Sequence, residues 1–357
     1  EGHAALAGYG RIFRASVELS GVVPQISIVT GVSAGGGAYS PALTDFVVMT
    51  ESARMFLTGP QIVREALGED VSMEELGGPQ VHSQNGVCQL VADDDRDAVA
   101  RARELLALLP SREDPGRVEP APAPQADPGA AVPAEARRVY DAREVASAIV
   151  DGGRILELSA DWARNMVTAF ARIEGRTVGI VANQPRRLGG VIDAEGSEKA
   201  ALFVNACDRF CIPLVVLVDT PGFMPGTGQE RAGVIRHGAS LLRAFAGARV
   251  PKLTVVLRKA YGGAVITMNS KDLGADMAFA WPQAEIGIMA APQAVGIVHR
   301  RDLEGAHDPE AARAELAATY AAEHLNAAAA AAAGYVDEVI EPAETRDRLA
   351  WALGALC

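Results

Sequence analysis

The segment VPQISIVTGVSAGGGAYSPALTD (residues 23–45) joins a short apolar run to three consecutive glycines, Gly35–Gly37. The run Ile26–Val29 predicts a buried strand, because β-branched residues favour strands. Consecutive glycines lose much conformational entropy on folding and bury no side chain. Their position directly after a strand indicates that another group comes close to the backbone there.

A second copy of this segment occurs later in the chain. VPKLTVVLRKAYGGAVITMNSKD (residues 250–272) aligns with residues 23–45 without a gap. The identical pairs include Pro24 with Pro251, Gly35 with Gly262, Gly36 with Gly263 and Asp45 with Asp272. Self-similarity of this kind indicates a duplicated domain.

A strand that ends in glycines at the start of a helix can bind an oxygen atom. The first N–H groups of a helix have no partner within it, and glycine lets an acceptor approach them. Aimed at a carbonyl oxygen that gains charge during a reaction, such donors form an oxyanion hole, each worth on the order of 3 kcal/mol. Two copies predict two such holes and two enolates. The alternative is that the glycines only permit tight packing of strand and helix.

Three other patterns suggest different chemistry. VDTPG (218–222) is similar to a GTPase loop, but the sequence contains no phosphate-binding G-x-x-x-x-G-K-[ST] motif. GVSAGG places Ser33 as in a nucleophile elbow, without an obvious histidine partner. Glu285 is a candidate acid or base for a hydratase of the crotonase type, although a structural role is favoured.

The overall composition limits the possible partners. The chain has 357 residues, 49% of them hydrophobic, and a formal net charge of -12. This balance, without a basic cluster, excludes nucleic acid as an expected partner. No apolar run is long enough to span a membrane, and the four cysteines form no zinc pattern. We therefore expect a cytoplasmic protein that binds no metal.

A Pro- and Ala-rich stretch divides the chain. Residues 113–133 (EDPGRVEPAPAPQADPGAAVP) lack hydrophobic periodicity and predict an extended, poorly packed linker. It separates a first domain, 1–112, from a second domain, 134–357. β-branched runs at 177–183 and 213–219 alternate with helical patterns at 196–210 and 232–246, which predicts an α/β fold.

Together these motifs carry a family resemblance. The chain resembles the carboxyltransferase β subunits of biotin-dependent acyl-CoA carboxylases, of the propionyl-CoA and acetyl-CoA carboxylase type. The motifs that carry the resemblance are GGGAYSPALTDFVVM (35–49), LTGPQIVREALGEDVSMEELGG (57–78), VGIVANQP (178–185), VDTPGFMPGTGQERAGVIRHGA (218–239), RKAYGGA (258–264) and AWPQAEIGIM (280–289).

The resemblance implies a fold, an assembly and a partner. The fold is two crotonase-like domains, each a spiral of ββα units, and the assembly is a homo-oligomer, a hexamer. Family members continue before the position matched by AGYG (7–10), so the first domain is interpreted as incomplete and the chain as N-terminally truncated. The implied partner is an α subunit with biotin carboxylase and biotin carboxyl carrier parts.

The resemblance also implies the reaction. A carboxyl group moves from carboxybiotin to the α-carbon of a short-chain acyl-CoA, propionyl-CoA or acetyl-CoA, to give methylmalonyl-CoA or malonyl-CoA. Alternatives that stay open are a biotin-dependent decarboxylase or transcarboxylase subunit and a non-catalytic truncated homologue.

Ten residues carry the implied site. The backbone N–H groups of Gly36 and Gly37 hold one enolate oxygen, that of the thioester, and those of Gly263 and Ala264 hold the other, that of biotin. Which pair holds which oxygen is open. Ile266 is implied to help select the acyl chain. The remaining implied contacts to substrate or biotin are Ala34, Gly35, Tyr39, Tyr261 and Gly262.

Overall fold

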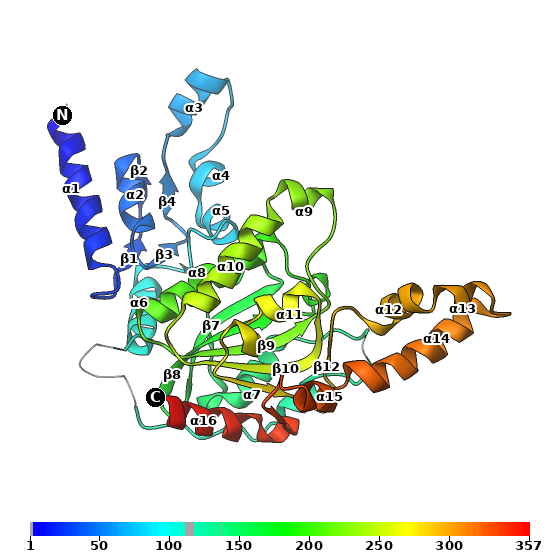
Figure 1. Cartoon of the computed structure of the whole chain (residues 1–357). Helices are drawn as coiled ribbons and strands as arrows, with labels where there is room; N and C mark the ends of the chain where they lie inside the picture. The colour runs from blue at the N-terminus through cyan, green and yellow to red at the C-terminus, as the bar shows by residue number, and fades with distance from the viewer. Residues whose placement is uncertain (1–2, 111–117, 136) are drawn as a thin grey trace. The chain divides into compact units, whose positions relative to one another are not determined.

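The chain folds into two compact units, each described here by itself. The computed structural model describes residues 3–110, 118–135 and 137–357. The first unit comprises Glu1–Gly116 and a short later segment, Leu156–Ala163; the second comprises Arg117–Ile155 and Arg164–Cys357. Strands and helices alternate along the chain (Figure 1), so the α/β class is confirmed.

The first unit is built on a parallel sheet of order β1-β3-β5, with a separate parallel pair, β2 and β4. Strand β3, FVVMT, is buried at every position, as expected for a strand covered on both faces. Val29, Met49 and Met55 form its core together with the thiol of Cys88. The elements are α1 (His3–Leu19), β1 (Ile26–Val29), β2 (Val32–Ala34), α2 (Gly36–Ala42), β3 (Phe46–Thr50), β4 (Arg54–Phe56), α3 (Pro60–Leu67), α4 (Met73–Gly77), α5 (Pro79–Gln84), β5 (Leu90–Ala92), α6 (Asp95–Leu108) and β6 (Leu156–Glu157).

The second unit has a larger sheet in which the strands follow the order β13-β11-β10-β9-β8-β7. All neighbours are parallel except the hairpin of β7 and β8. Every residue of β9, LVVLVDT, is buried, because helices cover both faces of a parallel sheet. The strands are β7 (Met166–Ile173), β8 (Arg176–Asn183), β9 (Leu214–Thr220), β10 (Lys252–Tyr261), β11 (Met277–Ala280), β12 (Glu285–Gly287), which pairs with the end of β10, and β13 (Glu338–Val339).

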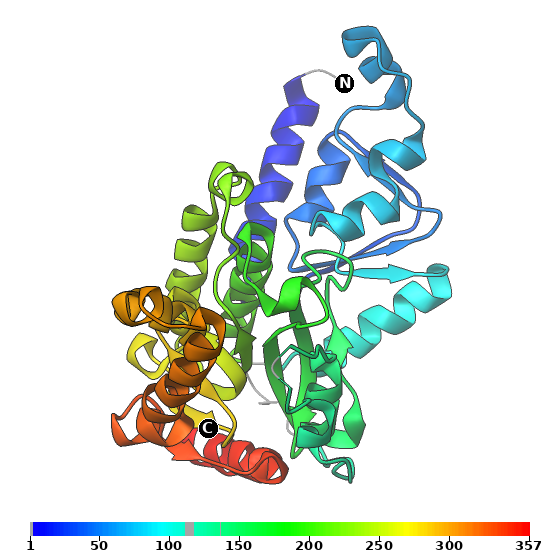
Figure 2. The same ribbon diagram turned by 90° about the vertical axis from the view of Figure 1, so that its right-hand side faces the viewer.

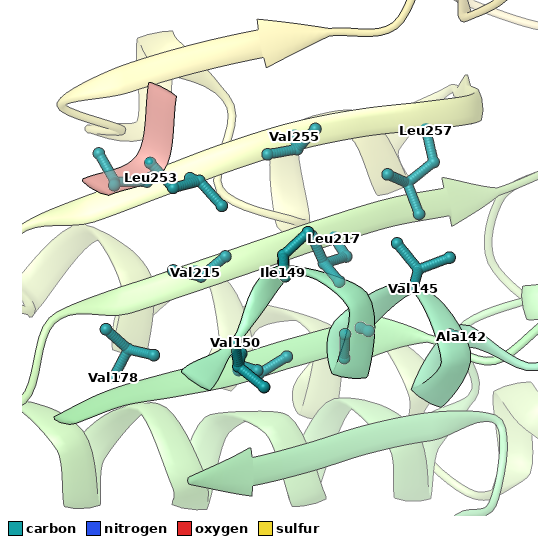
Figure 3. Packing of buried hydrophobic residues seen from close by; sticks show 14 of the residues in the cluster. Ala142, Val145, Ile149, Val150, Val178, Val215, Leu217, Leu253, Val255 and Leu257 are labelled. Carbon is teal, nitrogen blue, oxygen red and sulfur yellow. The ribbon is translucent and has the colours of Figure 1, made fainter. Parts of the chain in front are cut away.

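Helices α7 and α16 cover one face of this sheet, and α8 and α10 cover the other. Figure 3 shows α7 lying across the strands, with Val145 and Ile149 against apolar side chains of β9 and β10. On the opposite face Gly179 of β8 faces Cys207 of α8, where an added Cβ would lie 2.4 Å from the sulfur. These helices are α7 (Ala142–Ile149), α8 (Ala194–Arg209), α10 (Val234–Gly247) and α16 (Thr345–Leu356).

A group of shorter helices projects from the second unit, drawn in orange in Figures 1 and 2. It contains α12 and α14, which pack together, and α13 between them in sequence. Among the described residues no helix is both long and apolar enough to cross a membrane. The remaining short elements are α9 (Thr227–Arg231), α11 (Gly263–Thr267), α12 (Ala291–Val298), α13 (Arg300–Glu304), α14 (Pro309–Tyr320), the π-helical turn η5 (Ala321–Leu325), α15 (Ala327–Ala332), and 3₁₀ turns at Pro128–Ala131, Asp151–Gly153, Leu188–Gly190, Lys271–Leu273 and Pro342–Glu344.

The duplication found in the sequence is also present in the strand pairing. In the first unit Ile26 pairs with Phe46, and in the second the matched Leu253 pairs with Met277. Farther along, Val32 pairs with Arg54, while Lys259 pairs with Glu285. The predicted repeat is therefore confirmed, and it extends past the aligned segments to the partner strands.

The Pro- and Ala-rich stretch differs from the expected linker. Residues 113–117 lie outside the described residues, but from Val118 onwards the segment packs on the second unit. Val118 donates its N–H to the Gly175 carbonyl, and Gly152 donates to the Pro122 carbonyl. Proline lacks an N–H but keeps a good carbonyl acceptor, so a Pro-rich segment can bind a surface without forming a strand. Residues 118–127 are extended and largely exposed, as expected, whereas the expectation of poor packing is wrong for 128–133, where Pro128 and Val132 are buried. The domain boundaries stay a prediction.

Candidate active site

In the second unit a glycine turn ends strand β10. Gly262 has φ 63° and ψ −151° and precedes helix α11. Its N–H donates to the Gly287 carbonyl on β12 at 2.9 Å, and its own carbonyl accepts from Val265 at 3.1 Å. Within the described part of the chain no acceptor contacts the N–H groups of Gly263 and Ala264. The turn thus presents two neighbouring donors that are free for a ligand.

The first unit contains the same turn at the matched positions. Gly35 has φ 60° and ψ −129° and precedes α2. It donates to the Phe56 carbonyl on β4 at 3.1 Å and accepts from Ala38 at 3.0 Å. The N–H groups of Gly36 and Gly37 meet no acceptor among the residues that the structure describes. Both units therefore hold a pair of donors in one geometry.

The glycines of the two turns have different steric surroundings. A Cβ on Gly262 would lie 3.2 Å from the Ile288 carbonyl, and its positive φ strains any other residue. A Cβ on Gly263 would meet nothing within 4 Å. A Cβ on Gly36 would lie 3.2 Å from the ring of Tyr9. Gly262 is thus needed for the backbone, whereas Gly263 keeps the space in front of the donors open.

The turn in the second unit opens into a cavity of about 710 Å³. Three predicted residues, Gly262, Gly263 and Ile266, line it. Its walls are largely apolar, with Ile288 and Tyr335 among them. Such a pocket suits a flat, mostly apolar ligand with one polar edge.

Sequence reasoning missed two side chains of this cavity, Tyr320 and His324. Their rings lie 4.9 Å apart in an edge-to-face contact. They are held by the end of α14 and the π-helical turn η5 after it. The only signal in the sequence is an aromatic and a histidine four residues apart, which is too common a spacing to mark a site.

Tyr261 and Ala264 lie behind the turn. Tyr261 is buried, and its hydroxyl donates to the Glu285 carboxylate. Burial and this carboxylate raise the pKa of Tyr261 above its usual value, so the hydroxyl stays neutral. Ala264 is buried in α11. Glu285 thus accepts a hydrogen bond from Tyr261, which agrees with the structural role that the sequence favoured for it.

In the first unit the predicted side chains are more exposed. Ala34 is exposed at the end of β2. Tyr39 is half exposed, lies edge-on to Phe13 at 6.1 Å between ring centroids, and borders a shallow apolar hollow with Val17 and Leu43. The ten predicted residues thus form two sets, one at each glycine turn.

Comparison with known proteins gives a consistent result. The carboxyl transferase domain family matches residues 1–357. The chain is 51% identical to the methylmalonyl-CoA carboxyltransferase 12S subunit of Propionibacterium freudenreichii subsp. shermanii, over 99% of this chain and 68% of that protein. It is 49% identical to the biotin-dependent acetyl-/propionyl-coenzyme A carboxylase beta6 subunit of Mycobacterium tuberculosis, over 99% of this chain and 75% of the relative.

A solved structure agrees with these matches. The crystal structure of transcarboxylase 12S, a hexamer with methylmalonyl-coenzyme A and methylmalonic acid bound, superposes with a TM-score of 0.95 at 50% identity. The match covers 99% of this chain and 69% of that one. The crotonase-like fold expected from the sequence is thereby confirmed.

Proposed function

Because the chain belongs to the carboxyl transferase family, we propose that its two glycine turns are the two oxyanion holes of one carboxyl transfer. The protein is a carboxyltransferase subunit that transfers a carboxyl group between biotin and an acyl-CoA. The family and the enzyme class expected from the motifs are both confirmed. The proposal concerns which residues carry the reaction.

One observation carries the assignment of the site. Each unit ends a strand in a glycine with φ near 60°, and among the residues that the structure describes the next two N–H groups have no acceptor. A transfer of this kind develops negative charge on two oxygens, one on the thioester and one on the ureido group of biotin. Two fixed donors per oxygen stabilise that charge, because the donors need no reorganisation when it develops.

In this proposal Gly36 and Gly37 bind the thioester oxygen of the acyl-CoA. Removal of the α-proton moves charge onto this oxygen, and the two N–H groups hold it. Ala34, Gly35 and Tyr39 border the same turn and contact the substrate. Tyr39 offers a half-exposed ring for this contact.

Gly263 and Ala264 bind the ureido oxygen of biotin, the carrier that supplies the carboxyl group when bound. The cavity beside them fits such a group, since its walls are largely apolar, with a few polar side chains such as Ser270, Lys271 and His324 among them. Ile266 and Gly262 line it, while Tyr261 supports the turn from behind. The Ile266 side chain at this cavity cannot form hydrogen bonds, so we expect the enzyme to discriminate between acyl chains by size alone.

We further propose that biotin is carried by a partner subunit, an α subunit with biotin carboxylase and carrier parts, and that the protein works as a hexamer. The hexamer of transcarboxylase 12S supports the second point. The cytoplasm is the proposed compartment, supported by four cysteines that form no disulfide.

A transfer assay in the reverse direction tests the site. The assembled enzyme is incubated with methylmalonyl-CoA or malonyl-CoA and free biotin, and formation of propionyl-CoA or acetyl-CoA is followed with and without biotin. Biotin-dependent product formation is expected. Product formation at the same rate without biotin would show decarboxylation without transfer to biotin, and, like the absence of any reaction with either substrate, would contradict the proposed function.

A further inference from the structure

A buried carboxylate lies directly beside the irregular part of β10 that leads to the glycine turn. In the pairing of β9 with β10, Val218 is opposite Val256 and Thr220 is opposite Ala260. Three residues of β10, Leu257–Lys259, therefore face the single residue Asp219 of β9. Extra residues on one strand opposite a single residue of its neighbour form a β-bulge, which bends the strand and changes the direction of the residues that follow.

The bulge is the point where β10 changes partners. Before it, Leu253–Val256 pair with β11, and from Lys259, the last residue of the bulge, to Tyr261 the strand pairs with β12. The second pairing brings the Gly287 carbonyl to the N–H of Gly262. The direction taken by β10 at the bulge thus determines where Gly263 and Ala264 present their donors.

Both oxygens of the Asp219 carboxylate bind this bulge. Oδ1 accepts the backbone N–H of Lys259 at 3.2 Å, and Oδ2 accepts from Nε of Arg258 at 3.1 Å and contacts its Nη2 at 3.1 Å. The side chains of Asp219 and Arg258 are 0% and 5% exposed, so water does not compete for these contacts. Burial raises the pKa of Asp219, and the charges of Arg258 and Lys259 oppose this.

The two partners are themselves held in place. Nη1 of Arg258 donates to the backbone carbonyls of Pro133, Glu135 and Arg138 at 3.3, 3.2 and 2.9 Å. The N–H of Asp219 donates to Oδ1 of Asn183 at 3.2 Å. A fixed carboxylate and a fixed guanidinium leave the bulge with one conformation.

We infer that Asp219 is a positioning residue for the carboxyl transfer, which acts by fixing the β10 bulge and through it the two donors after Gly262. Arg258 shares this role by fixing the carboxylate. The effect of Asp219 on catalysis rests on the proposed function, whereas its effect on the conformation of the glycine turn does not.

Asp219→Asn is the direct test. An asparagine has a single acceptor oxygen, so either the Lys259 N–H or the Arg258 guanidinium would face an NH₂ group. Asp151→Asn is the matched control in the same unit. Asp151 is also buried, accepts the N–H groups of Glu174 and Gly175, and pairs with Arg346. It binds the turn between β7 and β8, and β8 lies two strands away from β10 in the sheet.

Two measurements on the assembled enzyme separate positioning from general stability. The first is kcat and KM for transfer between the acyl-CoA and free biotin. For Asp219→Asn we expect kcat to fall about tenfold to 100-fold with KM changed less than about threefold, because a displacement of about 1 Å costs on the order of 100-fold. Both substitutions are expected to lower Tm by similar amounts, because each removes an acceptor from a buried cluster, but Asp151→Asn should keep kcat within about twofold of wild type.

The second measurement is amide hydrogen exchange at Gly262, whose N–H donates to the Gly287 carbonyl on β12, and at Val265, whose N–H donates to the Gly262 carbonyl within the turn. Asp219→Asn should speed exchange there by about tenfold or more, whereas Asp151→Asn should speed it only near Glu174. Unchanged exchange at Gly262 and Val265 overturns the inference, whatever the activity. Faster exchange with unchanged kcat also overturns it.

A failure of the proposed function can be told apart from a failure of this inference. If the wild-type protein transfers no carboxyl group, the exchange data still decide whether Asp219 holds the turn. If Asp219→Asn does not fold, Arg258→Lys gives the same two readouts. Lysine keeps a positive charge near Asp219 but cannot also reach the three carbonyls, so a smaller change in the same direction is expected.

Discussion

The two glycine turns share a backbone geometry but differ in what supports it. Gly35 and Gly262 have similar φ and ψ and each donates to a carbonyl on the partner strand. In the second unit the strand before the turn is one continuous element, braced at Arg258 by Asp219. The position matched to Arg258 in the first unit is Gly31, which separates β1 from β2 and has open space around it.

This difference shows which part of the site the repeat retains. One hydrogen bond and one glycine are enough to define the direction of the two free donors. The support behind the turn is free to diverge, because many arrangements of charged or small residues can hold the same backbone. Three experiments test or refine this comparison, and a fourth probes the buried core of the first unit.

The largest effect is expected for Gly263→Val. Its side chain would occupy the space in front of the donors, where nothing lies within 4 Å, so the fold should be kept. We expect transfer activity to fall by about 100-fold or more, since one donor alone is worth on the order of 10²-fold. Steady-state kinetics and Tm measure the two effects.

Gly247→Val is the control for Gly263→Val, since it places the same side chain at another open glycine of the second unit. Gly36→Val tests the first unit, where the new side chain must also displace the ring of Tyr9. Loss of both activity and stability is expected at Gly36. Activity within about threefold of wild type in Gly263→Val would disprove the role of the second turn.

The second prediction concerns a buried thiol in the core of the first unit. Burial raises the pKa of Cys88 from 9.0 to about 11. A raised folded-state pKa stabilises the fold below pH 9, and this contribution is lost as the pH rises to 11. The free energy of unfolding should therefore fall by about 3 kcal/mol over this range because of Cys88, at 1.36 kcal/mol per pKa unit.

Urea titrations of wild type and Cys88→Ala between pH 8 and 12 measure the contribution of Cys88. Other groups, such as Cys207, also titrate at alkaline pH, so the difference between the two proteins is the informative quantity. An equal pH dependence in both proteins would show that this thiol is not shielded by the fold.

Gly35→Ala and Gly262→Ala compare the two turns directly. Both glycines adopt a conformation that other residues rarely tolerate, and each substitution should destabilise the protein by about 1–3 kcal/mol. Gly262→Ala should cost more, because its Cβ would lie 3.2 Å from the Ile288 carbonyl, against 3.9 Å from Leu57 at Gly35. Denaturant unfolding measures both, and a larger loss for Gly35→Ala would reverse the comparison.

The smallest effect is expected at Ile266 and at its matched position in the repeat, Tyr39, both about half exposed. If Ile266 selects the acyl chain by size alone, as proposed, wild type should accept acetyl-CoA as well as propionyl-CoA, with kcat/KM values that differ by about 10-fold to 200-fold. Ile266→Asp should shift this ratio by about tenfold, and Tyr39→Phe should leave it unchanged. Rejection of acetyl-CoA by more than about a thousandfold in wild type would show that size alone does not decide.

The sequence by itself determined the repeat, the strand before each glycine turn and the family. These features are local: they depend on residue types at fixed spacings, and Gly35–Gly37 and Gly262–Gly263 indicate a close backbone approach without any knowledge of neighbours. The predicted strands at 177–183 and 213–219 agree with β8 and β9 within a residue. The helices predicted at 196–210 and 232–246 likewise agree with α8 and α10 within two residues.

Only the tertiary structure decided which groups lie behind and around each turn. The carbonyls that fix Gly35 and Gly262 belong to Phe56 and Gly287, more than a strand away along the chain. Asp219 acts on β10 because the parallel pairing places one residue opposite three. Tyr320 and His324 reach the cavity through helices that come after β12 in the chain. Such contacts depend on how segments far apart in the sequence pack together, and the spacing of residues along the chain does not reveal that packing.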